Sequence, residues 1–226
     1  IITAGLETVG IRMPRHKLTL DLIRTLGAPV AAPSANRFGR TSPTTSEHVR
    51  AEFPDEIAKG EVLILDGGES QVGVESTVCM IDQETVVVLR PGGVTAEEIE
   101  ALGVNVKFSF NSENLRSSPG HTEHHYETKK PLIVSWTEPF DPKQTYRIEN
   151  RDVAGVNVLE VKLPSDAALA ARRLYAALRE ADLTKNEALF IHREPKSENH
   201  GLWNAIDDRL RRAARLHLGL PRRPKS

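Results

Sequence analysis

The sequence predicts an α/β fold made of two units. Short β-rich apolar runs alternate with segments of helical periodicity, which is the pattern of a sheet covered by helices. Between residues 111 and 131 this pattern stops, and polar residues replace nearly all apolar ones. We therefore expect domains over residues 1–110 and 132–220, a linker at 111–131 and a tail at 221–226.

The first half contains helices with clear end signals and several short apolar runs. Apolar residues at helical spacing that stop at Gly27 predict a helix over 16–26. A second helix begins at Thr45 or Ser46, whose hydroxyls suit an N-cap, and ends near Phe53. A capping box opens a third, over 95–102. Four runs predict strands, the last two forming a hairpin: 28–32, 62–65, 76–81 and 85–89.

The second half repeats strand and helix in alternation. Apolar runs predict strands at 132–134, 156–161 and 188–191. Amphipathic patterns predict helices over 165–181 and 202–218. This order is typical of a small doubly wound sheet, because parallel strands need helical crossovers.

Composition and charge exclude several classes of protein. Of the 226 residues, 39% are hydrophobic and 27% are charged, and the formal net charge is −1. Such a chain has no broad attraction for an anionic membrane, and no signal peptide or membrane-spanning run is apparent. One cysteine, Cys79, allows no intrachain disulfide, which fits a cytoplasmic protein. Because Cys79 lies in an apolar run, we expect it to be buried.

The loop at residues 32–45 has the composition of a ligand-binding segment. Hydroxyl residues, an amide and two arginines lie between a predicted strand and a predicted helix, with Pro33 and Pro43 stiffening the loop. Such a loop can hold phosphate at a helix N-terminus, and Ser34, Asn36 and Ser42 can hydrogen-bond a nucleotide. The alternative is an ordinary surface turn, which the same residue types also favour.

Five blocks of sequence, in this order, resemble the YrdC-type threonylcarbamoyl-AMP synthases: VGIRMP at 9–14, APSAN at 32–36, SPT at 42–44, GVESTV at 73–78 and LRPG at 89–92. The chain after Pro131 resembles the small second domain of the longer members. The resemblance implies a twisted mixed-sheet YrdC-like domain followed by a small Rossmann-like domain. Members carry a further segment ahead of the position matched by Ile1, with a Lys/Arg-rich phosphate-gripping motif and a threonine-binding Thr. We expect this chain to lack it.

The resemblance also implies an activity and its partners. The family joins L-threonine, bicarbonate and ATP into threonylcarbamoyl-AMP and pyrophosphate, and Mg²⁺ is expected with the ATP phosphates. The product serves the tRNA threonylcarbamoyl-transfer machinery that makes t6A37. Such a site needs cations for its anionic reactants and protection from water, rather than a nucleophilic side chain.

Residue by residue, the family motifs imply two sets of contacts. ATP would be bound by Thr8, Ser34, Asn36, Ser42, Arg90 and Tyr126, the last in a Ser-Pro-Gly to His-Tyr segment that crosses the site as a lid. Threonine would be bound by Arg12, the backbone of Ala32, and Ser76. No side chain is assigned a proton-transfer or nucleophilic role, and no metal site is assigned.

Several alternatives stay open at this point. Arg12 interrupts an apolar run, so it needs a carboxylate partner and could serve an internal ion pair instead. Glu75 could be a structural acid paired with Arg12 or Arg90, and Arg90 could be an exposed residue at the end of a strand. The cluster at 121–125 has metal-ligand residue types but lies in a polar linker, where firm coordination geometry is not expected. Functionally, the alternatives are an RNA-binding module, which the net charge disfavours, and an inactive fragment of the enzyme.

Overall fold

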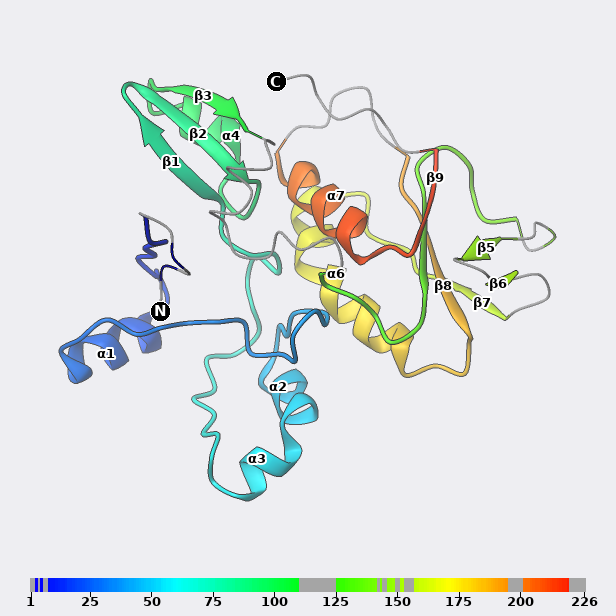
Figure 1. Cartoon of the computed structure of the whole chain (residues 1–226), viewed down its shortest axis with the longest axis horizontal. Helices are drawn as coiled ribbons and strands as arrows, with labels where there is room; N and C mark the ends of the chain where they lie inside the picture. The colour runs from blue at the N-terminus through cyan, green and yellow to red at the C-terminus, as the bar shows by residue number, and fades with distance from the viewer. Residues whose placement is uncertain are drawn as a thin grey trace.

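The computed structural model describes residues 3, 5, 8–109, 125–141, 143, 146–148, 151–152, 157–194 and 201–219. The predicted α/β class is confirmed. A mixed sheet has the strand order β1-β2-β3, a parallel sheet has the order β7-β8-β4-β9, and β5 and β6 form a two-stranded ladder. Helices α6 and α7 lie between the parallel sheet and the N-terminal part of the chain (Figure 1).

Local signals predict the beginnings of three helices of the first half, and a fourth short helix was not predicted. Helix α1 (Lys17–Leu26) ends at Gly27, whose φ of 68° is left-handed. Helix α2 (Ser46–Glu52) is capped by Thr45, whose side chain accepts a hydrogen bond from the amide of His48. Helix α3 (Pro54–Ala58) follows directly, and α4 (Ala96–Glu100) has the predicted capping box.

The mixed sheet contains the predicted hairpin and a strand that the sequence did not indicate. Strands β1 (Val78–Asp82) and β2 (Thr85–Arg90) pair antiparallel. Strand β3 (Asn105–Phe108) returns after α4 and pairs parallel to β2. Cys79 is exposed, contrary to expectation, because nothing among the described residues covers that side of β1.

The predicted strands at 28–32 and 62–65 are wrong. Neither segment is a strand, and each is largely exposed, Leu63 by 88% of its surface. A strand requires a neighbour for its backbone N–H and C=O groups, and no strand among the described residues lies beside either run. An apolar β-rich run therefore favours a strand, but the strand forms only where a neighbouring strand can pair with it.

The second half is built around the parallel sheet. Its strands are β7 (Val158–Glu160), β8 (Ala188–His192), β4 (Leu132–Ser135) and β9 (Leu216–Leu218). Alternate residues of the strands, such as Leu132 and Val134, pack with α6 (Ala167–Asp182) and α7 (Leu202–Ala213). Ile133 on the opposite face packs with Tyr146 and Phe140.

Two expectations for this half need correction. Both helices lie on one face of the sheet, and within the described residues the other face is covered by aromatic side chains rather than by a helix, so the doubly wound prediction is wrong in that respect. The helix predicted over 202–218 ends at Ala213, and the residues after it form β9. Leu216 and Leu218 alternate onto the sheet face of Phe190, and this packing overrides the helical pattern.

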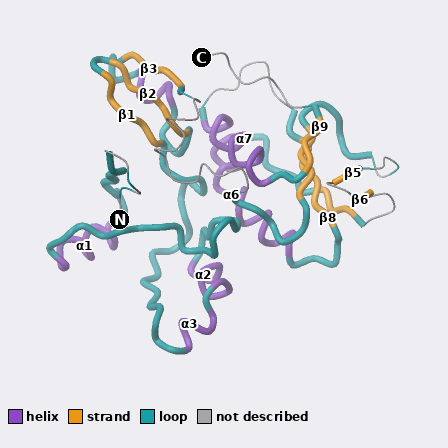
Figure 2. Tube along the Cα trace, in the orientation of Figure 1, coloured by secondary structure: helices purple, strands orange, loops and turns teal. Residues whose placement is uncertain are grey.

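The remaining elements are small. Strands β5 (Arg147–Ile148) and β6 (Arg151–Asp152) form a short antiparallel ladder. Figure 2 shows that strands and helices are dense around α6 and α7, whereas loops dominate the segments around α1, α2 and α3. None of the described helices has both the length and the apolar character needed to cross a membrane.

Candidate functional site

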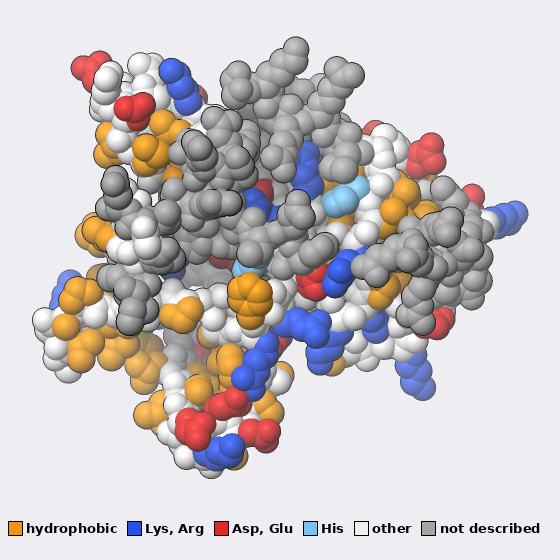
Figure 3. Space-filling view, in the orientation of Figure 1, with side chains coloured by type: hydrophobic (Ala, Val, Ile, Leu, Met, Phe, Trp, Pro, Cys, Tyr) orange, Lys and Arg blue, Asp and Glu red, His pale blue; other side chains and the backbone are white. Residues whose placement is uncertain are grey.

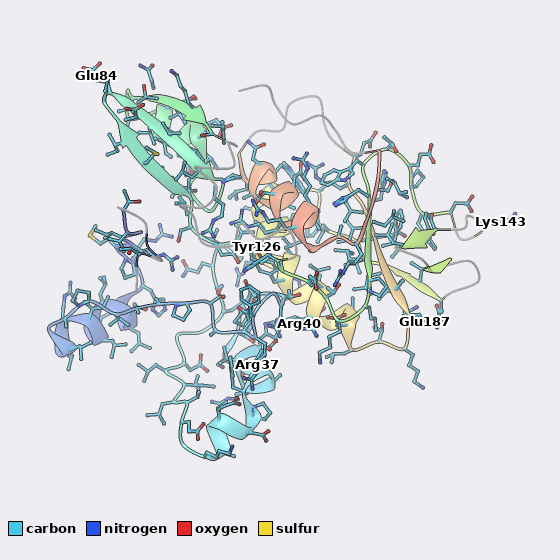
Figure 4. All side chains as sticks on the ribbon, viewed as in Figure 1. Arg37, Arg40, Glu84, Tyr126, Lys143 and Glu187 are labelled. Atoms are coloured by element: carbon cyan, nitrogen blue, oxygen red, sulfur yellow. The ribbon has the colours of Figure 1, made fainter. Side chains whose placement is uncertain are left out.

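The candidate site lies where loops of the first half meet α6 and α7. Tyr126 marks its position near the centre of the molecule (Figure 4). The loop before α2, the segment at 73–77 and the end of β2 all contribute residues that the sequence singled out. The site is described outward from Glu75, because its carboxylate joins these segments.

Glu75 is held by both halves of the chain. The Ser42 hydroxyl donates to its Oε1 at 2.8 Å, and the Tyr175 hydroxyl on α6 lies 2.9 Å from both oxygens. Arg209 on α7 donates from Nε to Oε2 at 2.9 Å. Burial would raise the pKa of Glu75, but the Arg209 charge and the Ser42 hydrogen bond outweigh it and hold that pKa below its usual value. The carboxylate is therefore ionised at neutral pH.

Arg209 is a buried cation of the site. It is 1% exposed, and its Nη1 donates to the carbonyl of Pro91 at 2.5 Å. Its guanidinium carbon lies 5.7 Å from the centre of the Tyr126 ring. Burial would lower its pKa, but Tyr175 and Glu75 outweigh that effect and raise it, so the residue is permanently charged.

Arg90 lies at the end of β2, as predicted, and its side chain turns inward. It is 4% exposed, so the alternative of an exposed residue at the strand end is wrong. Its Nη2 donates to the backbone carbonyl of Ser76 at 2.8 Å. Burial, reinforced by the nearby charge of Arg209, lowers its pKa. Arg90 therefore ties together two segments that carry predicted site residues.

Tyr126 has an uncommon backbone conformation. Its φ is 69°, a left-handed value for a residue with a side chain, and it is 1% exposed. Its ring packs on that of Tyr175 at 5.6 Å and against His125 at 4.2 Å. Burial, followed by the charge of Glu75, raises its pKa, so its hydroxyl stays protonated. Strain of this kind is found at ligand sites, where the surroundings enforce it.

The loop before α2 is fixed at both ends. Asn36 closes a turn by donating from Nδ2 to the carbonyls of Arg37 and Arg40, at 2.8 Å and 3.0 Å. Arg179 on α6 donates to the carbonyls of Thr41 and Ser42, at 2.5 Å and 3.3 Å. Ser42 thus sits on a loop that the second half holds rigid.

The structure does not bring every predicted residue to this cluster. Thr8, Arg12, Ala32 and Ser34 are exposed, and among the described residues no hydrogen bond or ion pair involves the side chains of Thr8, Arg12 and Ser34. The carboxylate partner expected for Arg12 is therefore absent there. Glu75 pairs with Arg209, which corrects the expectation of a pair with Arg12 or Arg90.

The residues that the structure describes include no candidate metal site. His121, Glu123 and His124 lie outside the described residues. Within the described ranges, no group of three or more His, Cys, Asp or Glu side chains is arranged to hold a metal ion.

Sequence reasoning missed the three residues that α6 and α7 contribute: Tyr175, Arg179 and Arg209. Helical periodicity explained the first two as parts of an amphipathic helix. A signal for Arg209 did exist, since it falls on the apolar stripe of its helix beside Ile206 and Leu210, both fully buried. A charge in that position needs a buried partner. No sequence pattern indicates that the partner is Glu75.

Comparison with protein families matches the whole of this arrangement in two parts. Residues 1–92 match the Sua5/YciO/YrdC family, described as "Telomere recombination". Residues 94–215 match the family described as "Threonylcarbamoyl-AMP synthase, C-terminal domain".

Curated relatives share this organisation. The chain is 39% identical over 232 residues to the threonylcarbamoyl-AMP synthase of Bacillus subtilis, covering 94% of this chain and 65% of that protein. It is 35% identical over 233 residues to the threonylcarbamoyl-AMP synthase of Pyrococcus abyssi, covering 95% of this chain and 66% of that protein. The chain thus spans just under two thirds of the length of these relatives.

Solved structures give the same result. The crystal structure of P. abyssi Sua5 complexed with L-threonine superimposes with a TM-score of 0.73 at 31% identity, over 96% of this chain and 67% of that one. A variant of the same protein, with an adjacent His and Tyr replaced by Ala, superimposes with a TM-score of 0.69 over 96% of this chain and 65% of that one.

Proposed function

The chain belongs to the Sua5 family of threonylcarbamoyl-AMP synthases, and from this membership we propose that it acts in making threonylcarbamoyl-AMP and pyrophosphate from L-threonine, bicarbonate and ATP. The product would supply the threonylcarbamoyl group for tRNA t6A37. In this proposal the mixed sheet belongs to a YrdC-like domain at 1–110, and the parallel sheet to a small C-terminal α/β domain at 132–220. The observation that carries the proposal is the convergence of Ser42, Ser76, Arg90 and Tyr126, all family-motif positions, around the ion pair of Glu75 and Arg209.

The ATP side of the site is the better supported. Arg90 is buried, charged and fixed by the Ser76 carbonyl, so it suits a phosphate oxygen. Ser42 is held in place by Glu75 and Arg179. Tyr126 packs on Tyr175 and near Arg209, which supports the lid role that the family motif assigns to it. For Thr8, Ser34 and Asn36, the family motifs carry the assignment.

The threonine side rests on the motifs and on exposure. Arg12 is exposed and free of carboxylate partners among the described residues, so its planar guanidinium is available for a substrate carboxylate. Ala32 would contribute its backbone and Ser76 its hydroxyl. In this arrangement the side chains bind, orient and neutralise charge, and water exclusion protects the carbamate and the mixed anhydride.

Magnesium enters this proposal with the nucleotide. The described residues hold no acidic cluster suited to a resident ion, whereas ATP phosphates carry Mg²⁺ through their own oxygens. The protein's contribution would be the cationic side chains around those phosphates. Arg90 is the described residue best placed for this role.

The test is a direct assay of the reaction. The purified chain is incubated with L-threonine, labelled bicarbonate, Mg²⁺ and ATP, and threonylcarbamoyl-AMP and pyrophosphate are measured. The assay is repeated with the part of the B. subtilis relative that the chain does not span, and the complete relative is the positive control. We expect product that requires all three substrates in at least one arrangement. If neither arrangement gives product while the complete relative does, the proposed function is wrong.

A substitution pair adds residue-level resolution to this assay. Arg90→Met should reduce product formation at least about tenfold, because it removes a charged hydrogen bond from the phosphate site. Arg173→Met is the matched control, since the ion pair of Arg173 among the described residues is an exposed one with Glu180 on the same helix. Equal activity of the two variants would remove Arg90 from the site.

A further inference from the structure

We propose that Arg209 of α7 is a positioning residue for the nucleotide site, which makes the second half of the chain part of the catalytic apparatus. The proposal rests on the proposed function for its consequence, but its geometry stands on contacts within the chain. Arg209 acts on the segments that carry Ser42, Ser76 and Arg90.

The guanidinium of Arg209 connects two segments of the site through hydrogen bonds. Its Nε binds the carboxylate of Glu75, and its Nη1 binds the carbonyl of Pro91, the residue after Arg90. The two segments also touch each other directly, since the amide of Gly93 donates to the Glu75 carbonyl at 2.9 Å. Gly92 packs so closely on this segment that an added Cβ would lie within 3.0 Å of the backbone of Ser76 and Thr77.

The contact of Arg209 with Glu75 also fixes the direction of the Ser42 hydroxyl. Glu75 is ionised, so it can only accept hydrogen bonds, and the single proton of Ser42 must point toward it. The lone pairs of Ser42 are then left for a ligand that donates. The contacts from Arg209 through Glu75 thus determine that Ser42 acts as a hydrogen-bond acceptor toward a bound nucleotide.

Stability alone does not account for a pair of this kind, in which Arg209 is fully buried and Glu75 largely so. Replacing a buried ion pair by apolar residues of similar volume is often neutral or stabilising, so such a pair is weak support for a purely structural role. Here Glu75 also receives hydrogen bonds from Tyr175 and Ser42, and with Arg209 and Pro91 the arrangement spans five separate segments. We infer that the network serves geometry at the site.

The experiment separates folding from positioning with a charge-neutral double variant. Arg209→Met leaves the largely buried Glu75 without its cation and is expected to lose stability, whereas the Glu75→Gln/Arg209→Met double variant removes both charges and should recover thermal stability. Hydrogen–deuterium exchange of 39–44, 73–77 and 91–94 is measured in each variant without ligand. Affinity for Mg²⁺–ATP is then measured by calorimetry. Arg173→Met is the control for loss of a helix arginine.

We expect the double variant to unfold near the wild-type temperature and yet to exchange faster in these three segments. Its ATP dissociation constant should rise about tenfold, the effect of losing one or two oriented hydrogen bonds. Wild-type exchange in the stable double variant would show that Arg209 is merely structural and overturn the proposal. If the wild-type chain binds no ATP, the proposed function loses support, while the exchange result still decides the role of Arg209.

Discussion

The two halves of the molecule respond differently to equally regular sequence patterns. In α1 no residue is buried, although its amphipathic pattern is as clear as that of α7, where six residues are buried. Among the described residues, Val88 and Leu89 are the only buried apolar side chains ahead of Tyr126. Figure 3 shows apolar side chains gathered on the surface at α1, and Ile11 and Met13 are each 91% exposed.

The difference shows that an amphipathic pattern specifies a face and leaves its partner unspecified. Helices α6 and α7 find partners in each other and in the parallel sheet, so their apolar stripes form one core. The first half is held to this core by Val74 and by polar contacts, such as Arg179 with Glu52 and Arg172 with Glu69. Its order thus depends on the second half more than on a core of its own.

The largest effect should come from matched leucine deletions in the two halves. Leu174→Ala in α6 removes a fully buried side chain and should lower the free energy of unfolding by about 2–5 kcal/mol. Leu22→Ala in α1, where Leu22 is 42% exposed, should lower it by about 0.5 kcal/mol or less. Urea denaturation of both variants measures the contrast. Similar losses would mean that α1 has a partner in solution.

Two glycines with left-handed backbones test the contact between the halves. Gly73 has a φ of 83°, and an added Cβ would lie within 3.0 Å of the backbone of Ala171 and Arg172 on α6. Gly73→Ala should therefore cost backbone strain of about 1–3 kcal/mol and a steric clash in addition. Gly27, with a φ of 68°, has open space around it, so Gly27→Ala should cost about 1–2 kcal/mol of strain only.

The measurement for this pair is thermal unfolding together with protection of α6 from hydrogen exchange. Only Gly73→Ala should reduce protection on the α6 face that carries Ala171. If Gly27→Ala destabilises the protein as much, the packing of the 73–77 segment on α6 contributes nothing measurable.

Local signals in the sequence predicted the elements whose determinants are local. The Gly27 stop, the Thr45 cap and the capping box at Thr95 are decided within a few residues, and each is confirmed. Strands β3 and β9 escaped prediction because each pairs in parallel with a strand that precedes it by at least one helix, so no hairpin turn marks its position. The runs at 28–32 and 62–65 failed for the converse reason, since they lack a neighbour among the described residues.

The same division applies to the site. Ser42, Ser76, Arg90 and Tyr126 belong to short motifs, and the structure brings them around one buried pair. The partner of Glu75 is 134 residues away in sequence, so no spacing rule reveals it. What the sequence could offer was the anomaly of Arg209 on an apolar stripe. Because a cation on an apolar stripe requires a buried partner, the candidates for that partner are the carboxylates of the protein.

A smaller effect is expected from two arginines on α6 that differ in what they hold. Arg179→Met removes donors from the Thr41 and Ser42 carbonyls and from Glu52, so it should cost about 1–3 kcal/mol. Arg173→Met removes an exposed pair with Glu180 and should cost less than about 0.5 kcal/mol. Chemical denaturation measures both. Equal costs would show that the polar contacts between the halves do not stabilise the first half.

The smallest effect is a dependence on pH that arises at the same contact. His48 of α2 accepts a hydrogen bond from the Thr44 amide through Nδ1, and burial, reinforced by the charge of Arg179, lowers its pKa below 6.5. Between that lowered pKa and 6.5 the unfolded chain binds more protons than the folded one, so stability should fall as the pH drops through this range. His125 and His217, whose pKa values burial also lowers, act in the same direction.

His48→Asn keeps an acceptor for Thr44 and removes one titrating group, so its unfolding temperature should fall less than that of the wild type between about pH 7.5 and about pH 5.5. A variant as sensitive to acid as the wild type would assign the whole effect to the other two histidines, and would show that the neutral form of His48 is not required where α2 meets α6.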